Sequence, residues 1–130
     1  MVKAGDTFLY QYPENDRHLF IVVLDNFSNG NEIIYPCVIV TSWTGNPKLD
    51  DPACILDVGD HEFIRHKSYI AYKEVVLFER DYIETCLEYG IFKVKPPVSE
   101  ELLERIINSA SASRKISKNN LRYFTGKPQS

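Results

Sequence analysis

The stretch GDHEFIRHKSYIAY, residues 59–72, concentrates side chains that can transfer protons or bind an anion. It holds two of the three histidines of the chain, His61 and His66, with an arginine, a lysine, a serine and two tyrosines. A strand that only fills a core usually carries more valine, isoleucine and leucine and fewer titratable groups. Two interpretations fit this composition: the polar rim of a barrel, or a site that handles a phosphate.

The composition is that of one ordinary globular domain. Of the 130 residues, 44% are hydrophobic and 25% are charged, and the formal net charge is −3. This balance argues against a generic nucleic-acid coat but allows a local basic patch. Neither a signal peptide nor an apolar run of the ~18 residues that a membrane span needs is present.

The three cysteines, Cys37, Cys54 and Cys86, are widely spaced and form no CxxC pair. We therefore expect buried free thiols in a reducing cytoplasm. The histidines have no spacing typical of a zinc site, and we expect neither a metal ion nor a cofactor.

Short strand patterns separated by turns dominate the first 95 residues. Residues 7–12 alternate in strand period, and residues 17–24 are a nearly continuous apolar run, typical of a strand buried on both faces. Asn29-Gly30 predicts a hairpin turn, and Pro36 in the return strand, residues 33–41, predicts an edge position or a bulge. Further strands are expected at residues 54–56, 68–72, 75–78 and 91–95.

Two helices are predicted after these strands. Asp81 and Glu84 have the spacing of a capping box, and Gly90 would end that helix. A longer helix should run from Ser99, a suitable N-cap, to Ser111, with one apolar face. The sequence thus predicts a mainly β fold, a small SH3-like barrel with a packed C-terminal helix in residues 1–113. Residues 114–130 would form a basic tail, whose apolar residues could still build a short docking helix.

Four short motifs follow one another in a distinctive order. Gly5-Asp6 opens the first strand, Arg17-His18 opens the second, residues 38–42 end in Thr-Ser, and residues 98–102, VSEEL, open the long helix. Over residues 4–110 this order resembles the PemK/MazF-like toxins of bacterial toxin–antitoxin pairs, which are small SH3-like barrels. The chain departs from that family in having His18 where a proline is usual, and Ser-Tyr-Ile-Ala at 68–71 where an Asp-Gln-x-Arg-type stretch is common.

The resemblance implies a homodimer that cleaves single-stranded RNA without a metal ion and is inhibited by a cognate antitoxin protein. By position, Arg17 would bind the scissile phosphate, while Thr41 and Ser42 would orient it. Such cleavage needs a base, an acid and cationic groups, and His18 or His66 could move the protons. The residues expected to contact RNA are Arg65, Lys67, Tyr69, Tyr72 and Trp43, of which Trp43 could instead cap the core.

Two other classes of function fit the same sequence. The barrel could be a non-catalytic binding module whose groove captures a peptide or protein partner, or a structural protein of a mobile element. The departure at residues 68–71 favours these alternatives, whereas Arg17, Thr41 and Ser42 favour the nuclease. A small acidic reading frame beside the gene would favour the toxin.

Overall fold

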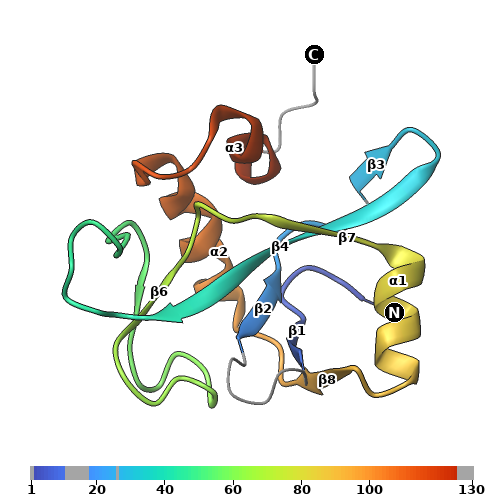
Figure 1. The fold of residues 1–130 in the computed structure, drawn as a ribbon, viewed down its shortest axis with the longest axis horizontal. Helices are drawn as coiled ribbons and strands as arrows, with labels where there is room; N and C mark the ends of the chain where they lie inside the picture. The colour runs from blue at the N-terminus through green and yellow to red at the C-terminus, as the bar shows by residue number, and fades with distance from the viewer. Residues whose placement is uncertain (1, 11–17, 26, 126–130) are drawn as a thin grey trace.

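Residues 2–10, 18–25 and 27–125 are described by the structure, a computed structural model. In this part of the chain, eight strands form one antiparallel sheet, accompanied by three α-helices and a short 3-10 helix (Figure 1). The strands are β1 (Thr7–Tyr10), β2 (Leu19–Val22), β3 (Phe27–Asn29), β4 (Glu32–Ser42), β5 (Ile55–Leu56), β6 (Ser68–Ile70), β7 (Val76–Glu79) and β8 (Phe92–Lys95). The helices are α1 (Arg80–Glu88), α2 (Glu100–Ser109), η1 (Ala110–Ala112) and α3 (Lys118–Thr125).

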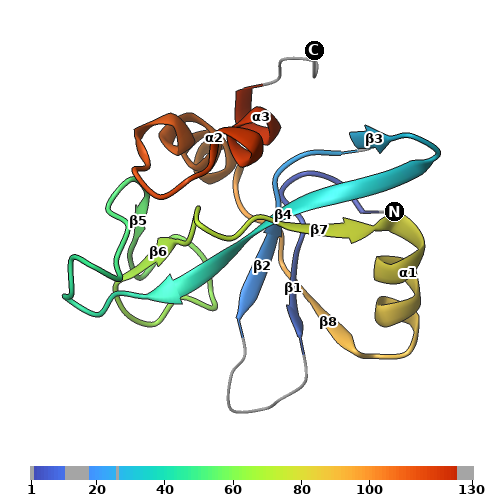
Figure 2. The same cartoon turned by 45° about the horizontal axis from the view of Figure 1, so that its top comes forward.

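The long strand β4 is the centre of the sheet. It pairs with β2 and β3 along one edge and with β6 and β7 along the other, and it crosses the whole molecule in Figures 1 and 2. From β2 the sheet continues through β1 to β8, and from β6 it continues to β5. The predicted mainly β fold is confirmed. Within the described residues no ladder joins β5 to β8, so the sheet is open.

Pro36 lies inside this central strand, so the predicted edge position is wrong. Along the edge that faces β2, pairing with β2 stops at Cys37 and pairing with β3 starts at Ile34. Pro36 therefore falls where the neighbouring strand changes, and its carbonyl accepts a hydrogen bond of 2.9 Å from the amide of Val23. A residue without an N–H group is tolerated at such a gap in the ladder.

Alternating side chains of the strands fill two apolar clusters, one on each face of the sheet. Along β2, Leu19 and Ile21 enter the first cluster, while Phe20 and Val22 enter the second. This confirms that β2 is buried on both faces. The helices supply Leu102, Ile106, Tyr123 and Phe124 to the first cluster, and Ile83 and Cys86 to the second. Figure 2 shows the corresponding arrangement, with α2 and α3 on one side of β4 and α1 on the other.

Both predicted helices are present, but only one has the predicted cap. The Ser99 hydroxyl accepts a hydrogen bond of 3.1 Å from the amide of Leu102, so the cap of α2 is confirmed. Helix α1 begins at Arg80, directly after β7, and within the described residues no side chain caps its first turn. The Asp81 capping box is therefore wrong, because the strand enters the helix without the turn that such a cap needs. Gly90 has φ of 73° and ends α1 as predicted.

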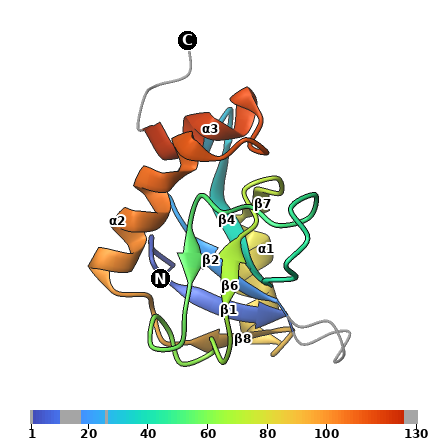
Figure 3. The ribbon, with the colours of Figure 1, turned by 90° about the vertical axis from the view of Figure 1, so that its left-hand side faces the viewer.

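The segment after residue 113 includes a helix that packs on the sheet. Tyr123 and Phe124 of α3 are buried, and their rings meet Phe27 and Tyr72 edge-on at centroid distances of 5.1 and 5.6 Å. Figure 3 shows α2 alongside the sheet with α3 at one end of it. No helix in the described residues is long and apolar enough to cross a membrane.

Candidate functional site

The end of β4 collects most of the residues that were predicted to act on RNA. Thr41 pairs with Tyr69 and Ser42 pairs with Ser68 in the β4–β6 ladder. On the other edge of β4, β2 pairs through Leu19, so His18 lies directly before that ladder. Because neighbouring residues of a strand point to opposite faces, the side chains of Thr41 and Ser42 lie on different faces of the sheet. The predicted catalytic residues therefore form two groups rather than one.

The first group lines a pocket of about 550 Å³, which we call the strand-end pocket. Thr41, His18 and Tyr69 all lie in its wall. Four charged side chains also line it: Asp51, Lys73, Glu74 and Lys115. Its charges are mixed, with two lysines and two carboxylates around a histidine and a hydroxyl.

His18 contacts the backbone of β4 in this pocket. Its Nδ1 lies 3.4 Å from the carbonyl oxygen of Val40, and a carbonyl oxygen can only accept, so Nδ1 is the donor in this contact.

The second group is a hydrogen-bonded pair on the protein surface. The Ser42 hydroxyl lies 2.7 Å from Nε2 of His66, and both residues are exposed. When Nε2 is unprotonated the hydroxyl donates to it, and when Nε2 is protonated the ring donates instead, so the pair is held in both states. The loop before β6 is fixed by the Ser68 hydroxyl, which donates to the His66 carbonyl at 3.0 Å.

Trp43 and Lys67, the residues that follow Ser42 and His66 in the chain, form a cation–π contact. The Lys67 ammonium lies 4.2 Å from the centroid of the Trp43 ring, and the Trp43 amide donates to the Lys67 carbonyl at 3.0 Å. The Trp43 ring meets the Tyr69 ring edge-on, with centroids 5.9 Å apart. Tyr69 donates its hydroxyl to the carbonyl of Leu49, and burial raises its pKa, so the phenol stays protonated. Trp43 and Lys67 thus present an aromatic face and a positive charge together.

Two predicted residues belong to neither group, and a third cannot be placed. Tyr72 is fully buried, donates its hydroxyl to the carbonyl of Ile106 at 2.5 Å, and has its pKa raised by burial. Tyr72 is a core residue and cannot stack on an RNA base. Arg65 is exposed and lines a separate hollow with Lys95. Arg17 lies outside the described residues.

His61 has a structural role in the turn where it was expected. Its Nδ1 accepts a hydrogen bond of 3.0 Å from the amide of Phe63, and its Nε2 lies 2.6 Å from the carbonyl of Pro96. The same carbonyl accepts a hydrogen bond of 2.8 Å from the hydroxyl of Thr7. A neutral ring with its hydrogen on Nε2 satisfies both backbone contacts. The stretch 59–72 therefore contains both core anchors and exposed polar groups.

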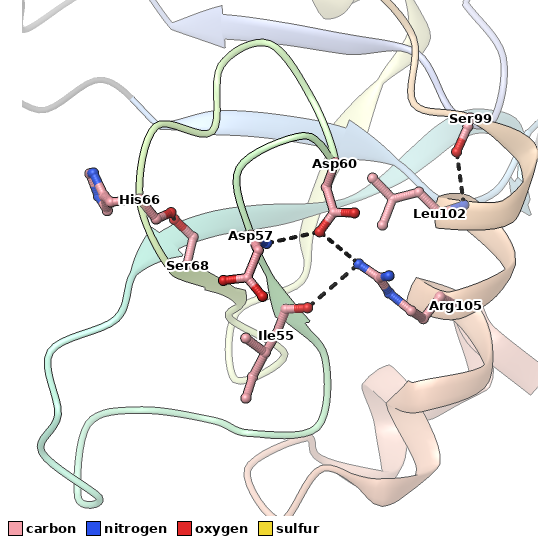
Figure 4. A network of polar contacts seen from close by, with 8 residues as sticks. All are labelled: Ile55, Asp57, Asp60, His66, Ser68, Ser99, Leu102 and Arg105. Atoms are coloured by element: carbon pink, nitrogen blue, oxygen red, sulfur yellow. Dashed lines mark hydrogen bonds and ion pairs between the residues drawn. The ribbon is translucent and has the colours of Figure 1, made fainter.

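The loop that leads into this stretch is tied to helix α2. Arg105 donates to the Asp60 carboxylate at 2.9 Å, and the same carboxylate oxygen accepts from the amide of Asp57 at 2.8 Å. Figure 4 shows Arg105 reaching from the helix to this loop, while the His66 side chain points away from the network. The network holds the loop in place without engaging the exposed histidine.

Two aspartates in the loop between β4 and β5 were not recognised from the sequence as part of a site. Asp50 is buried and accepts hydrogen bonds from the Thr44 amide, the Thr44 hydroxyl and the Gly45 amide at 3.0, 2.8 and 2.7 Å. Burial alone would raise the pKa of Asp50, but these hydrogen bonds lower it below the ordinary aspartate value. Asp51, also buried, accepts from the Ser113 hydroxyl at 2.5 Å. For the hydrogen bonds of Asp50, the sequence contained local signals in the turn residues 44–46, TGN, and in the Asp-Asp-Pro stretch at 50–52.

The C-terminal segment closes over this loop, and no local signal in the sequence could have shown it. Lys115 donates to the carbonyl of Lys48 at 2.6 Å. Arg114 and Lys115 also line a second pocket, of about 510 Å³, on whose wall Trp43 lies. We call this the tryptophan pocket. The contact joins residues more than 60 positions apart, so it depends on the fold and not on a local pattern.

Comparison with protein-family models and with curated proteins found no match to this chain. Among the described residues, no group of three histidine, cysteine, aspartate or glutamate side chains is arranged to hold a metal ion. The geometry at the end of β4 and the resemblance of the sequence are therefore the basis for a functional proposal.

Proposed function

We propose that this protein is a metal-independent endoribonuclease of the PemK/MazF-like toxin type, which cleaves single-stranded RNA at the end of β4. One observation carries the proposal: two histidines contact the last residues of β4 from its two edges. His18, before β2, contacts the Val40 carbonyl at 3.4 Å, and His66, before β6, contacts the Ser42 hydroxyl at 2.7 Å. Cleavage without a metal needs one base and one acid, and two histidines can supply both. Because Thr41 and Ser42 point to opposite faces of the sheet, the proposal requires the RNA backbone to pass around the end of β4 between the two histidines.

The reaction begins when the ribose 2′-oxygen attacks the neighbouring phosphorus and ends when the bond to the 5′-oxygen breaks. A 2′,3′-cyclic phosphate forms, and the next nucleotide leaves with a 5′-hydroxyl. We assign His18 as the base that takes the proton of the 2′-hydroxyl, because it lies with Thr41 in the wall of the strand-end pocket. We assign His66 as the acid, whose protonated ring gives a proton to the 5′-oxygen while Ser42 orients it.

The transition state carries extra negative charge on the phosphate, which nearby cations and donors stabilise. Lys73 and Thr41 line the strand-end pocket, and Lys67 lies over Trp43 on the neighbouring surface. The resemblance alone assigns Arg17, the arginine at the predicted start of the second strand, to binding this phosphate. Trp43 offers a face on which an RNA base can stack.

The proposal also includes an SH3-like barrel, two protein partners and a cytoplasmic location. A central strand that pairs with two strands along each edge supports an SH3-like barrel left open between β5 and β8. By resemblance, the protein forms a homodimer and binds a cognate antitoxin protein. The three buried free cysteines, Cys37, Cys54 and Cys86, agree with a reducing cytoplasm.

One observation favours a second function, a non-catalytic module that captures a peptide or protein partner. The strand-end pocket contains Asp51 and Glu74 as well as Lys73 and Lys115. Such mixed charge suits a peptide with side chains of both signs at least as well as a phosphate.

Incubation of a mixed single-stranded RNA pool with the protein in EDTA tests the proposal. Wild type should cleave the pool, and His18→Ala, His66→Ala and Thr41→Ala should each be slower, the histidine variants by about 10²-fold. Arg80→Ala, on α1 at the far end of the sheet, is the matched control and should cleave like wild type. Absence of wild-type cleavage would favour the binding module, and full activity of both histidine variants would place the chemistry elsewhere.

A further inference from the structure

The tryptophan pocket is separate from the two histidines but shares a wall with the strand-end pocket. Asp51 and Lys115 line both pockets. Trp43, in the wall of the tryptophan pocket, contacts Tyr69 in the wall of the other. A ligand that occupies both pockets can therefore be one continuous chain.

The lining of the tryptophan pocket combines apolar residues with two cations. The apolar residues are Trp43, Pro47, Pro52 and Ala112, and the cations are Arg114 and Lys115. The pocket volume of about 510 Å³ falls within the range of roughly 300–1,000 Å³ that small-molecule sites occupy. A flat aromatic group with an attached anion suits this combination.

The two carboxylates of the pocket are already engaged within the protein. Asp50 accepts three hydrogen bonds from its own loop, and Asp51 accepts from the Ala53 amide at 3.1 Å and from the Ser113 hydroxyl at 2.5 Å. The cations are less engaged. Lys115 donates to a carbonyl, and Arg114 is exposed with no hydrogen bond or ion pair to any described residue. Their remaining donors can bind an anion.

We infer, on the basis of the proposed function, that the tryptophan pocket binds one nucleotide of the RNA next to the cleaved phosphate. The base stacks on Trp43, and Arg114 and Lys115 bind a phosphate of the same nucleotide. Aromatic stacking accepts every base, and arginine binds phosphate through two parallel hydrogen bonds. The segment after residue 113 thereby becomes part of the RNA-binding surface.

Trp43 is the only tryptophan of the chain, so its fluorescence reports directly on this pocket. A ten-nucleotide RNA of mixed sequence, added to the full-length His66→Ala protein, should change the Trp43 emission. The dissociation constant is measured in parallel from the anisotropy of a labelled copy of the same RNA, which does not depend on Trp43.

The variants Arg114→Gln and Lys115→Gln, made in the same background, should each weaken binding about tenfold. Each should also reduce the slope of log K against log salt by about 0.7, as expected for one lost phosphate contact on a single strand. Arg80→Gln removes an exposed arginine from α1 and should leave both the affinity and the slope unchanged. Equal melting temperatures of the variants would exclude loss of folding as the cause.

RNA binding that leaves Trp43 emission unchanged and is insensitive to Arg114→Gln would overturn the inference, even if the wild type cleaves RNA. Binding that depends on Arg114 and changes Trp43 emission would support it, even if no cleavage is found and the nuclease proposal fails. An acidic peptide rich in glutamate provides the competing ligand. If that peptide alters Trp43 emission and the RNA does not, the pocket is a peptide site and the inference is wrong.

Discussion

At the level of single residues, the three histidines differ in what their ring nitrogens contact. Both nitrogens of His61 contact backbone groups, so this ring joins the turn to the end of β8. His18 lies in the wall of the strand-end pocket with its Nδ1 near the Val40 carbonyl, and His66 contacts a side-chain hydroxyl on the surface. The His61 ring is buried, and its two nitrogens cannot exchange protons without breaking their backbone bonds. His18 and His66 are therefore the histidines to which we assign chemistry.

A pair of carboxylates gives a prediction on pH at the same scale. A hydrogen bond with Glu32, and repulsion from its charge, raise the pKa of Glu79 above the ordinary glutamate value. A group whose pKa is higher in the folded state stabilises the fold at low pH, and this contribution is lost as the pH rises through the folded pKa. Above that pKa the charged Glu79 is repelled by Glu32, so Glu32→Gln should raise the melting temperature at pH 7. Near pH 3 Glu79 is protonated and the repulsion is absent, and the amide can keep the hydrogen bond, so the substitution should have little effect.

Thermal melts of wild type and Glu32→Gln between pH 3 and pH 8 measure this difference. A difference in melting temperature that stays constant over the whole range would contradict the prediction. Glu88→Gln, which also removes an exposed glutamate, is the control for the change in net charge.

Single-residue predictions succeeded where the decisive interaction is local. The Ser99 cap depends on an amide three residues away, and the sequence shows both partners. Tyr72 was misassigned because its burial depends on Ile106 and Phe124, which arrive from α2 and α3. Its neighbours in the sequence, Ala71 and Lys73, give no sign that two helices cover it.

At the level of elements, we expect the stability of the fold to depend strongly on the turn at His61. His61→Ala removes the side chain that bonds the Phe63 amide and the Pro96 carbonyl, and His61 is buried. The Pro96 carbonyl keeps its hydrogen bond from the Thr7 hydroxyl, but the Phe63 amide loses its partner. One unsatisfied backbone group costs about 1–3 kcal/mol, so we expect a loss of this order in the free energy of unfolding.

Urea denaturation of wild type and His61→Ala checks this loss. The exposed neighbour Glu62→Ala is the control and should change the free energy of unfolding by less than about 0.5 kcal/mol. An equally small change for His61→Ala would show that water replaces the imidazole without cost.

The positions of the strands and helices in the sequence were largely predictable, whereas the pairing between strands was not. The continuous apolar run of β2 and the hairpin signal at Gly30 led to strands that the structure contains. The position of Pro36 was misjudged because the change of partner from β2 to β3 depends on the register of three strands. A single sequence records which residues favour a strand but not which strands lie on either side of it.

At the level of the whole molecule, the site is assembled from distant parts of the chain. The strand-end pocket takes residues from β4, β6 and the segments that precede β2 and follow η1. The sequence suggested Thr41 through the resemblance, His18 as a titratable group beside Arg17, and Tyr69 through the composition of residues 59–72. It could not suggest Asp51 or Lys115, because their approach depends on how residues 113–115 close over the loop.

The proposed homodimer is a prediction at this scale. Light scattering at micromolar concentration should give twice the 15.0 kDa mass of one chain. Large apolar side chains on β7, on β8, on α1 and at the C-cap of α1 are exposed in the single chain and would suit an interface: Leu77, Val94, Tyr82 and Tyr89. A single species of 15.0 kDa across that concentration range would contradict it.

The central claim is that two histidines at the end of β4 transfer the protons of RNA cleavage. The most direct measurement is the initial rate of cleavage of single-stranded RNA in EDTA between pH 5 and pH 9, for wild type, His18→Ala and His66→Ala. The wild-type rate should pass through a maximum, because the base must be unprotonated and the acid protonated. His18→Ala should lose the rise on the acid side, and His66→Ala should lose the fall on the alkaline side. Absence of cleavage at every pH, or a wild-type profile in both variants, would contradict the claim.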